Sequence, residues 1–252
     1  RPGVDMTAAA ATPAVFFPAR VFVLELRRML RNRRTVIFTL ALPPLTFLLV
    51  TQGVGAGASG YLMVSLGVYG ALVAVTAIGA GVSVDRAAGW SRQLRLSPLR
   101  PVGYVLVKAA VAMTAGALAI GAVFAVGAVR GVHLPVRVWV ACALLAWGGS
   151  VVFAAFGLAM GYLLPMDNAM QLLGPLLALL GFAGGLFVPL DQLGPVFAVL
   201  GRFMPTYGVG ALARWPLVGT ESVPVALLNL VVWTAVFVAL ATWRFRRDTA
   251  RV

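Results

Sequence analysis

The chain has 252 residues, of which 61% are hydrophobic and only 11% are charged. Soluble domains are roughly half apolar and about a quarter charged, and no soluble fold hides this much apolar surface from water. Composition therefore excludes a soluble enzyme, a nucleic-acid-binding domain and a disordered chain, and it indicates an integral membrane protein. The net charge of +13 comes mainly from arginines that flank long uncharged stretches, which is the pattern of membrane-topology signals rather than of a nucleic-acid-binding surface.

The residues before the first uncharged stretch form two segments. We expect residues 1–17 to be flexible, with Met6 as the natural start and residues 1–5 left over from cloning. Residues 18–34 have a helical periodicity that predicts an amphipathic helix in the cytoplasmic membrane interface. Its basic face carries Arg20, Arg27, Arg31 and Arg34, and its apolar face carries Phe22, Leu26 and Met29. A generic membrane anchor and a partner-binding helix are equally compatible with this pattern.

Stretches without charged side chains predict six membrane-spanning helices, because about 20 mainly apolar residues are needed to cross the hydrocarbon core. The predicted spans are residues 35–51, 61–84, 102–129, 138–164, 172–188 and 223–243, and a glycine-rich turn at 52–60 separates the first two. The expected fold is therefore an all-α integral membrane protein. A six-span domain covers residues 35–243, and a basic cytoplasmic tail follows at 244–252.

The arginines are distributed unequally between the two sides of the predicted membrane domain. Fifteen of the nineteen lie before the first span, between the second and third spans, or in the tail. Because cytoplasmic loops carry the excess of basic residues, this places both termini in the cytoplasm. The preference for arginine over lysine fits a GC-rich bacterial genome, and we expect the bacterial plasma membrane. The single lysine, Lys108, lies near the start of a span and is expected to snorkel to the cytoplasmic surface.

An apolar segment at residues 191–205 is too short to cross the membrane. Prolines border and interrupt it, which predicts a re-entrant external helical hairpin between the fifth and sixth spans. The hairpin candidates are Pro189, Pro195, Pro205 and Tyr207.

Prolines inside spans one and five should kink those helices, and kinks can either line a transport pathway or only shape the packing. The weak pathway candidates are Pro43, Pro44, Phe47, Pro175, Phe182 and Phe187. Gly157 and Gly161 have the spacing that allows close helix approach.

Several kinds of chemistry are missing from the sequence. With one cysteine, Cys142, and one histidine, His133, the chain can form neither an intrachain disulfide nor a Cys/His zinc cluster. Lys108 does not belong to a P-loop, so the chain has no nucleotide-binding motif. For these two reasons we expect no metal or cofactor to be bound. All seven acids lie outside the spans or at their ends, which disfavours an ion-coupled carrier and an enzyme acting on lipids.

The segment between spans two and three, residues 85–101, is the most informative part of the chain. Ala87, Trp90 and Leu94 share a helical face, while Arg92 and Arg95 lie elsewhere. Such a segment is either a short cytoplasmic helix that docks into a partner or a solvated topogenic loop. The local pattern leaves the two alternatives equally open.

Two stretches together resemble the membrane permeases of the type-2 ABC exporter family, which includes permeases of the daunorubicin/doxorubicin resistance kind. The first comprises Asp85-Arg86, Gly89, Leu94, Ser97-Pro98 and Lys108. The second comprises Gly184-Gly185, Pro189, Leu193-Gly194-Pro195, Met204-Pro205-Thr206-Tyr207 and Arg214. The chain departs from the family pattern in having Asp85 for glutamate, Trp90 for threonine and Gly184 for serine.

The resemblance implies a permease that lacks its own ATPase. Two copies of a separate nucleotide-binding subunit, carrying ATP and Mg, would dock on the cytoplasmic face, and a second permease, identical or homologous, would complete the path. Membrane lipid would be a further partner. We expect no nucleic-acid partner. The residues implied to couple to the ATPase are Asp85, Arg86, Gly89, Trp90, Arg92, Leu94, Arg95, Ser97, Arg27, Arg28 and Arg31.

The implied activity is export of a hydrophobic or amphipathic compound, such as a drug, a natural product or a lipid-like molecule. An exporter of a polysaccharide or glycolipid and an ion-coupled secondary transporter are the alternatives.

Overall fold

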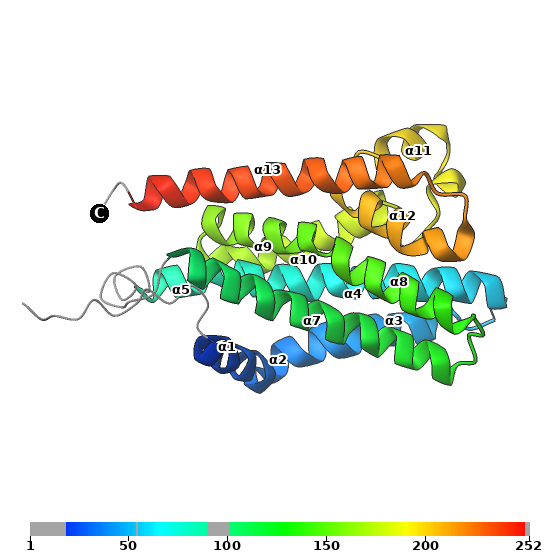
Figure 1. Ribbon diagram of the computed structural model, residues 1–252, viewed down its shortest axis with the longest axis horizontal. Coiled ribbons are helices and arrows are strands. Elements are labelled where there is room, and N and C mark those ends of the chain that lie inside the picture. The colour runs from blue at the N-terminus through cyan, green and yellow to red at the C-terminus, as the bar shows by residue number, and fades with distance from the viewer. Residues whose placement is uncertain (1–18, 54, 90–100, 250–252) are drawn as a thin grey trace, which may run out of the picture.

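The protein forms a bundle of helices that run mostly along one long axis (Figure 1). The computed structural model describes residues 19–53, 55–89 and 101–249, and in these ranges all regular structure is helical. The elements are α1 (Ala19–Arg31), α2 (Arg33–Val36), the π-helical turn η1 (Ile37–Ala41), α3 (Leu42–Val50), α4 (Ala56–Ala80), α5 (Val82–Ala87), α7 (Pro101–Val129), α8 (Val136–Gly149), α9 (Val151–Leu163), α10 (Met166–Ala183), the 3-10 turn η2 (Leu190–Leu193), α11 (Pro195–Gly201), α12 (Pro205–Val218) and α13 (Val223–Thr249).

Four helical stretches among the described residues are long and apolar enough to cross a membrane. They are Ala58–Ala87, Val102–Val129, Val136–Leu163 and Val223–Phe245, and they coincide with the predicted second, third, fourth and sixth spans. The first of them combines α4 and α5, and the third combines α8 and α9. These long apolar helices confirm the all-helical membrane class.

The predicted first and fifth spans are less regular. The first consists of α2, η1 and α3 in succession, with Pro43 and Pro44 in the first turn of α3. Prolines donate no backbone hydrogen bond, and a π turn directly before them changes the hydrogen-bond register at that point. The fifth corresponds to α10, which contains Pro175. The bent pair α11–α12 could count as a fifth crossing of the described chain, so the six-span topology stays a prediction.

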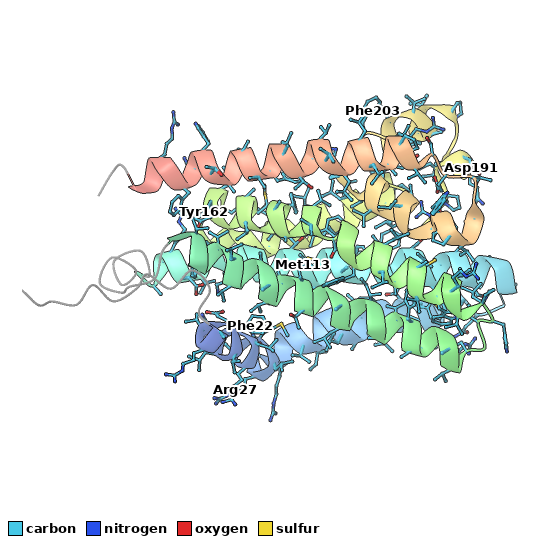
Figure 2. All side chains as sticks on the ribbon, viewed as in Figure 1. Phe22, Arg27, Met113, Tyr162, Asp191 and Phe203 are labelled. Carbon is cyan, nitrogen blue, oxygen red and sulfur yellow. The ribbon has the colours of Figure 1, made fainter. Side chains whose placement is uncertain are left out.

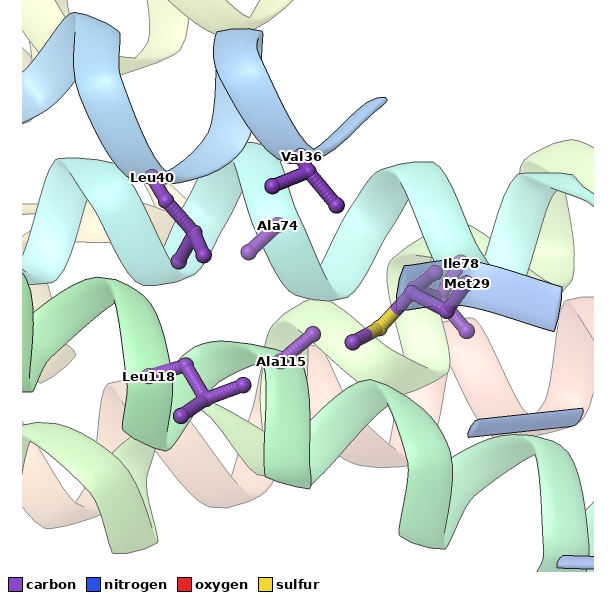
Figure 3. Close-up of a pocket in the computed structure, with 7 residues that line it drawn as sticks. All are labelled: Met29, Val36, Leu40, Ala74, Ile78, Ala115 and Leu118. Carbon is purple, nitrogen blue, oxygen red and sulfur yellow. The ribbon is translucent and has the colours of Figure 1, made fainter. Parts of the chain in front are cut away.

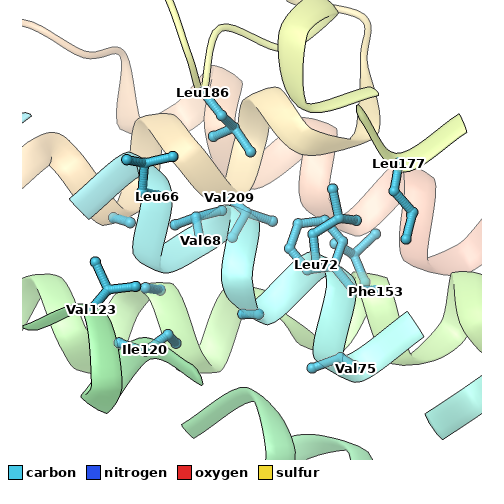
Figure 4. Packing of buried hydrophobic residues seen from close by; sticks show 14 of the residues in the cluster. Leu66, Val68, Leu72, Val75, Ile120, Val123, Phe153, Leu177, Leu186 and Val209 are labelled. Carbon is cyan, nitrogen blue, oxygen red and sulfur yellow. The ribbon is translucent and has the colours of Figure 1, made fainter. Parts of the chain in front are cut away.

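Helix α4 lies at the centre of the bundle. In its most apolar window 72% of the residues are buried, against 17% in α13, whose outer side leaves valines and leucines exposed. Large side chains fill the spaces around α4, as Figure 4 shows for Leu72, Phe153 and Val209.

Glycines allow α4 and α9 to approach at backbone contact. A Cβ atom on Gly157 would lie only 2.7 Å from the carbonyl oxygen of Thr76, and one on Gly161 would lie 2.8 Å from the carbonyl oxygen of Gly79. The close helix approach predicted from the spacing of Gly157 and Gly161 is therefore confirmed.

The two ends of the bundle differ in character. Helices α1 and α5 and the C-terminal end of α13 lie together at one end, here called the basic end (Figure 1). The segment from η2 to α12 lies at the opposite end, here called the hairpin end. This grouping matches the arginine distribution in the sequence, because Arg86 and Arg244 belong to the basic end and Arg202 to the other. That the basic end faces the cytoplasm stays a prediction.

Candidate functional site

Five polar side chains from three helices meet at the basic end. Lys108 of α7 contacts two carboxylates, with its Nζ 2.7 Å from Asp85 Oδ2 and 2.8 Å from Glu25 Oε2. Tyr104 donates its hydroxyl hydrogen bond to Asp85 Oδ2 at 2.7 Å, and Arg28 Nη1 donates to Asp85 Oδ1 at 3.0 Å. These residues, called the charge cluster below, contain two acids and two bases. They join α1, α5 and α7 in one nearly neutral network.

The burial of Lys108 contradicts the expectation that it snorkels to the surface. Lys108 is only 4% exposed. Its ammonium group contacts two carboxylates and lies 5.6 Å from the centre of the Tyr104 ring. These partners compensate the buried charge, so the side chain does not need to extend to water. A clue to this pairing was present in the sequence. Glu25 lies four residues before Met29 and therefore on the apolar face of an otherwise arginine-rich helix.

The predicted docking arginines of α1 differ in their surroundings. Arg28 reaches the charge cluster, and its hydrogen bond to the Asp85 carboxylate raises the pKa of the guanidinium above its ordinary value. Arg27 and Arg31 are exposed, and Figure 2 shows Arg27 on the outward side of α1 and Phe22 on the side toward the bundle. Arg28, whose side chain is itself 61% exposed, therefore ties α1 to α5 from the surface, and Arg27 and Arg31 are exposed on the same helix.

Arg86, the neighbour of Asp85, is directed to a different helix. Its Nη1 donates hydrogen bonds to the carbonyl oxygens of Tyr162 at 2.8 Å and Gly161 at 3.2 Å, in the last turn of α9. A cation there satisfies carbonyl groups that have no partner within the helix and complements the helix dipole. Adjacent residues of α5 thus bind α1 and α7 on one side and α9 on the other.

The chain leaves the bundle directly after these residues. Gly89 follows α5 with a φ of +75°, a conformation that favours glycine. The other predicted coupling residues, Trp90, Arg92, Leu94, Arg95 and Ser97, lie outside the described residues. The coupling helix itself therefore stays a prediction.

The predicted pathway residues differ in their burial, and a pathway through them stays a prediction. Phe47 is fully buried, and Pro43 and Pro44 are also buried. Phe187 is half-buried against Tyr69, with their ring centres 4.7 Å apart. Pro175 and Phe182 are exposed on α10.

A small pocket lies between α1, α4, α7 and the segment from α2 to η1 (Figure 3). It is lined by Met29, Val36, Leu40, Ala74, Ile78, Ala115 and Leu118. Its volume of about 10 Å³ is close to that of one water-sized sphere, which is too small for a drug-like molecule.

The hairpin differs from its predicted extent. Pro189 is half-buried, Pro195 begins α11 and Pro205 begins α12, and the two helices meet at 94°. Residues 205–214, including Tyr207, are all buried. The buried helix α12 extends beyond the predicted segment 191–205, and the re-entrant hairpin itself stays a prediction.

Side-chain hydrogen bonds hold the hairpin in place. Asn229 of α13 donates to the carbonyl oxygens of Arg202 and Met204 at 2.9 and 3.1 Å, which satisfies backbone groups at the bend. Thr206 donates to the carbonyl oxygen of Leu180 at 2.6 Å, and a Cβ atom on Gly184 would overlap its hydroxyl group. This contact explains why glycine stands at position 184.

Sequence reasoning missed a second buried cation at the hairpin end. The predicted spans place Arg214 in the segment between the fifth and sixth spans, outside the membrane, yet it is only 2% exposed, in α12. No local pattern pointed to its burial, since its partners Ser65 and Glu221 come from other segments.

The sequence is similar to those of known transport proteins. A family model described as "ABC-2 family transporter protein" matches residues 29–243. The chain is also 25% identical over 238 residues to the protein named "Putative transport permease YvfS" of Bacillus subtilis (strain 168), an alignment that covers 90% of this chain and 96% of that protein.

Proposed function

Because the chain belongs to the ABC-2 family of transporter proteins, we propose that it acts as the permease subunit of an ATP-driven exporter and is moved by a separate ATPase subunit. The observation that carries this proposal is the charge cluster. It ties α1 and α7 to Asp85, four residues before Gly89, where the chain leaves the bundle. A force applied to the segment after Gly89 would therefore act on several helices at once.

The proposed coupling runs through Asp85 and Arg86. Two ATPase subunits with ATP and Mg would bind at the basic end, and the segment around residues 90–97 would act as the coupling helix. Asp85 would transmit the displacement of the coupling helix to α1 and α7, and Arg86 would transmit the same displacement to α9. The exposed Arg27 and Arg31 would complete the docking surface. Charge-assisted hydrogen bonds suit this task because they are short and directional.

We further propose that the substrate is a hydrophobic or amphipathic compound and that two permeases form its path. The pocket at Met29 and Ile78 holds about 10 Å³, which is too small for such a compound. Exposed apolar residues, such as Leu49 at 70% and Leu179 at 62%, leave surfaces that lipid or a second permease can cover.

The first test is affinity purification of the tagged chain from its native membrane in mild detergent, with mass spectrometry and an ATPase assay. We expect a P-loop subunit to copurify with vanadate-sensitive activity, and inverted membrane vesicles to accumulate a hydrophobic dye only when ATP is present. A chain that purifies alone, together with dye movement that follows a proton gradient and ignores ATP, would contradict the proposal and favour an ion-coupled carrier.

A further inference from the structure

A second polar cluster lies at the hairpin end, around the buried Arg214. Its Nη1 donates to Ser65 Oγ at 3.2 Å, and its Nη2 lies 3.2 Å from Glu221 Oε1. The guanidinium carbon is 4.7 Å from the centre of the Tyr61 ring. The Nε atom is buried and has no acceptor in the described part of the chain. These four residues, called the Arg214 cluster, join α12 to α4 and to the loop before α13.

The contacts of Arg214 form only while α12, α4 and the loop before α13 keep their relative positions. A buried guanidinium is costly unless its donors are satisfied, so each lost partner weakens the packing of α12. Room for the group comes from Gly210, where a Cβ atom would lie 2.8 Å from Arg214 Nη1. The Glu221 side chain is 21% exposed, against 3% for Arg214. Water can therefore reach Glu221 first, and the Arg214–Glu221 pair is the contact most readily broken.

One helical stretch connects this cluster to the charge cluster. Tyr61 and Ser65 lie near one end of Ala58–Ala87, and Asp85 lies near the other. At about 1.5 Å per residue, the twenty residues from Ser65 to Asp85 span roughly 30 Å, which is about the thickness of the hydrocarbon core. Gly79 binds this stretch to α9 at backbone contact, so the two helices move together. A displacement of Asp85 therefore reaches Ser65 with little loss.

We propose that Arg214 is a positioning residue of the transport cycle: its contacts hold α12 against α4, and its pair with Glu221 breaks when the ATPase displaces α4. The inference rests on the proposed function and adds a gate at the hairpin end to it. Separation of α12 from α4 opens the route by which the substrate leaves. Arg214 makes three separate contacts in this gate, with the Glu221 carboxylate, the Ser65 hydroxyl and the Tyr61 ring. Each contact can therefore be removed by its own substitution.

The test measures how readily a buried position on α12 becomes accessible. The sole native cysteine, Cys142, is replaced by alanine, and Val209→Cys places a thiol on α12 at a position that is 0% exposed. Figure 4 shows Val209 close to Leu66 and Leu186 in the core. The complete complex in proteoliposomes is treated from the hairpin side with a membrane-impermeant maleimide, with and without ATP and Mg. We expect slow labelling without nucleotide and faster labelling with it.

The decisive variant is Glu221→Gln, which removes the charge pair and keeps the shape of the side chain. It should raise the nucleotide-free labelling rate about tenfold, the factor that corresponds to 1.4 kcal/mol. Arg214→Lys keeps the charge but cannot reach Ser65 and Glu221 together, so it should act in the same direction. Asp191→Asn removes an exposed acid at the same end and serves as the matched control, with an unchanged rate.

Three outcomes would overturn the inference. In the first, ATP accelerates labelling of the parent chain but Glu221→Gln leaves the nucleotide-free rate unchanged; the gate is then wrong and the proposed function stands. In the second, Glu221→Gln lowers the yield of the complex without changing labelling, which indicates a merely structural role. In the third, ATP does not change labelling of the parent chain, and the proposed function fails together with the gate. If Arg214→Lys does not assemble, Glu221→Gln decides the question alone.

Discussion

Replacing Lys108 by methionine tests the charge cluster most directly. The change keeps the length of the side chain and removes the buried cation that contacts Asp85 and Glu25 at 2.7 and 2.8 Å, while Arg28 still contacts both acids from the surface. Removing one member of a buried ion pair costs about 3–5 kcal/mol, because the remaining charge stays buried without compensation. Asp85 keeps Arg28 and Tyr104 as partners, so we expect the lower end of that range, about 3 kcal/mol.

The assay is reversible unfolding of the purified chain in mixed micelles titrated with a denaturing detergent. Arg27→Met is the matched control, because it removes an exposed cation from α1, and it should change the free energy of unfolding by less than about 0.5 kcal/mol. The double variant Lys108→Met/Glu25→Gln should recover part of the loss, since Glu25 no longer remains charged without its lysine. A Lys108→Met chain as stable as the Arg27→Met chain would refute the reasoning that Lys108 is held by its carboxylates.

Three further predictions follow from single contacts. Gly157→Ala places a Cβ atom 2.7 Å from the carbonyl oxygen of Thr76, so it should cost about 1–3 kcal/mol in the same unfolding assay, whereas Gly121→Ala, which meets nothing within 4 Å, should be nearly neutral. Arg86→Gln removes a charged donor from the end of α9 and should destabilise the chain by about 1.5–3 kcal/mol; ATPase activity that responds to substrate as in the parent complex would show that Arg86 is not part of the coupling path. Cys142 is 0% exposed and should react with a maleimide only after unfolding, which mass spectrometry of labelled and unlabelled protein detects.

The long helices could be predicted from the sequence because apolar length alone identifies them. Four of the six predicted spans coincide with apolar helices of 23 to 30 residues. The segment around Pro43 and Pro44 shows the limit of that method. Proline indicates an interruption, but whether the chain kinks, bulges into a π turn or ends depends on the helices packed against it.

The candidate site was only partly predictable, for a different physical reason. Asp85, Arg86 and Arg28 were identified through the family pattern, yet their partners were not, because the ion pair between Lys108 and Glu25 joins residues 83 positions apart. Considered alone, a lysine near the end of a span is expected to reach for solvent. Its actual position depends on whether acids from other helices arrive at the same depth, and only the folded chain decides that.

The distribution of polar contacts along Ala58–Ala87 suggests how one helix can serve both ends of the protein. The middle of the stretch makes close-packed contacts through apolar side chains and glycines. Its two ends carry the directional contacts, Ser65 with Arg214 and Asp85 with Lys108. Close packing in the middle resists deformation and transmits a displacement along the stretch, whereas a short charge-assisted bond at either end is either made or broken. Such a stretch transmits a displacement from one end of the bundle to the other. Weakening one cluster should therefore change how readily the contacts of the other cluster break, across roughly 30 Å and without a change in the core between them.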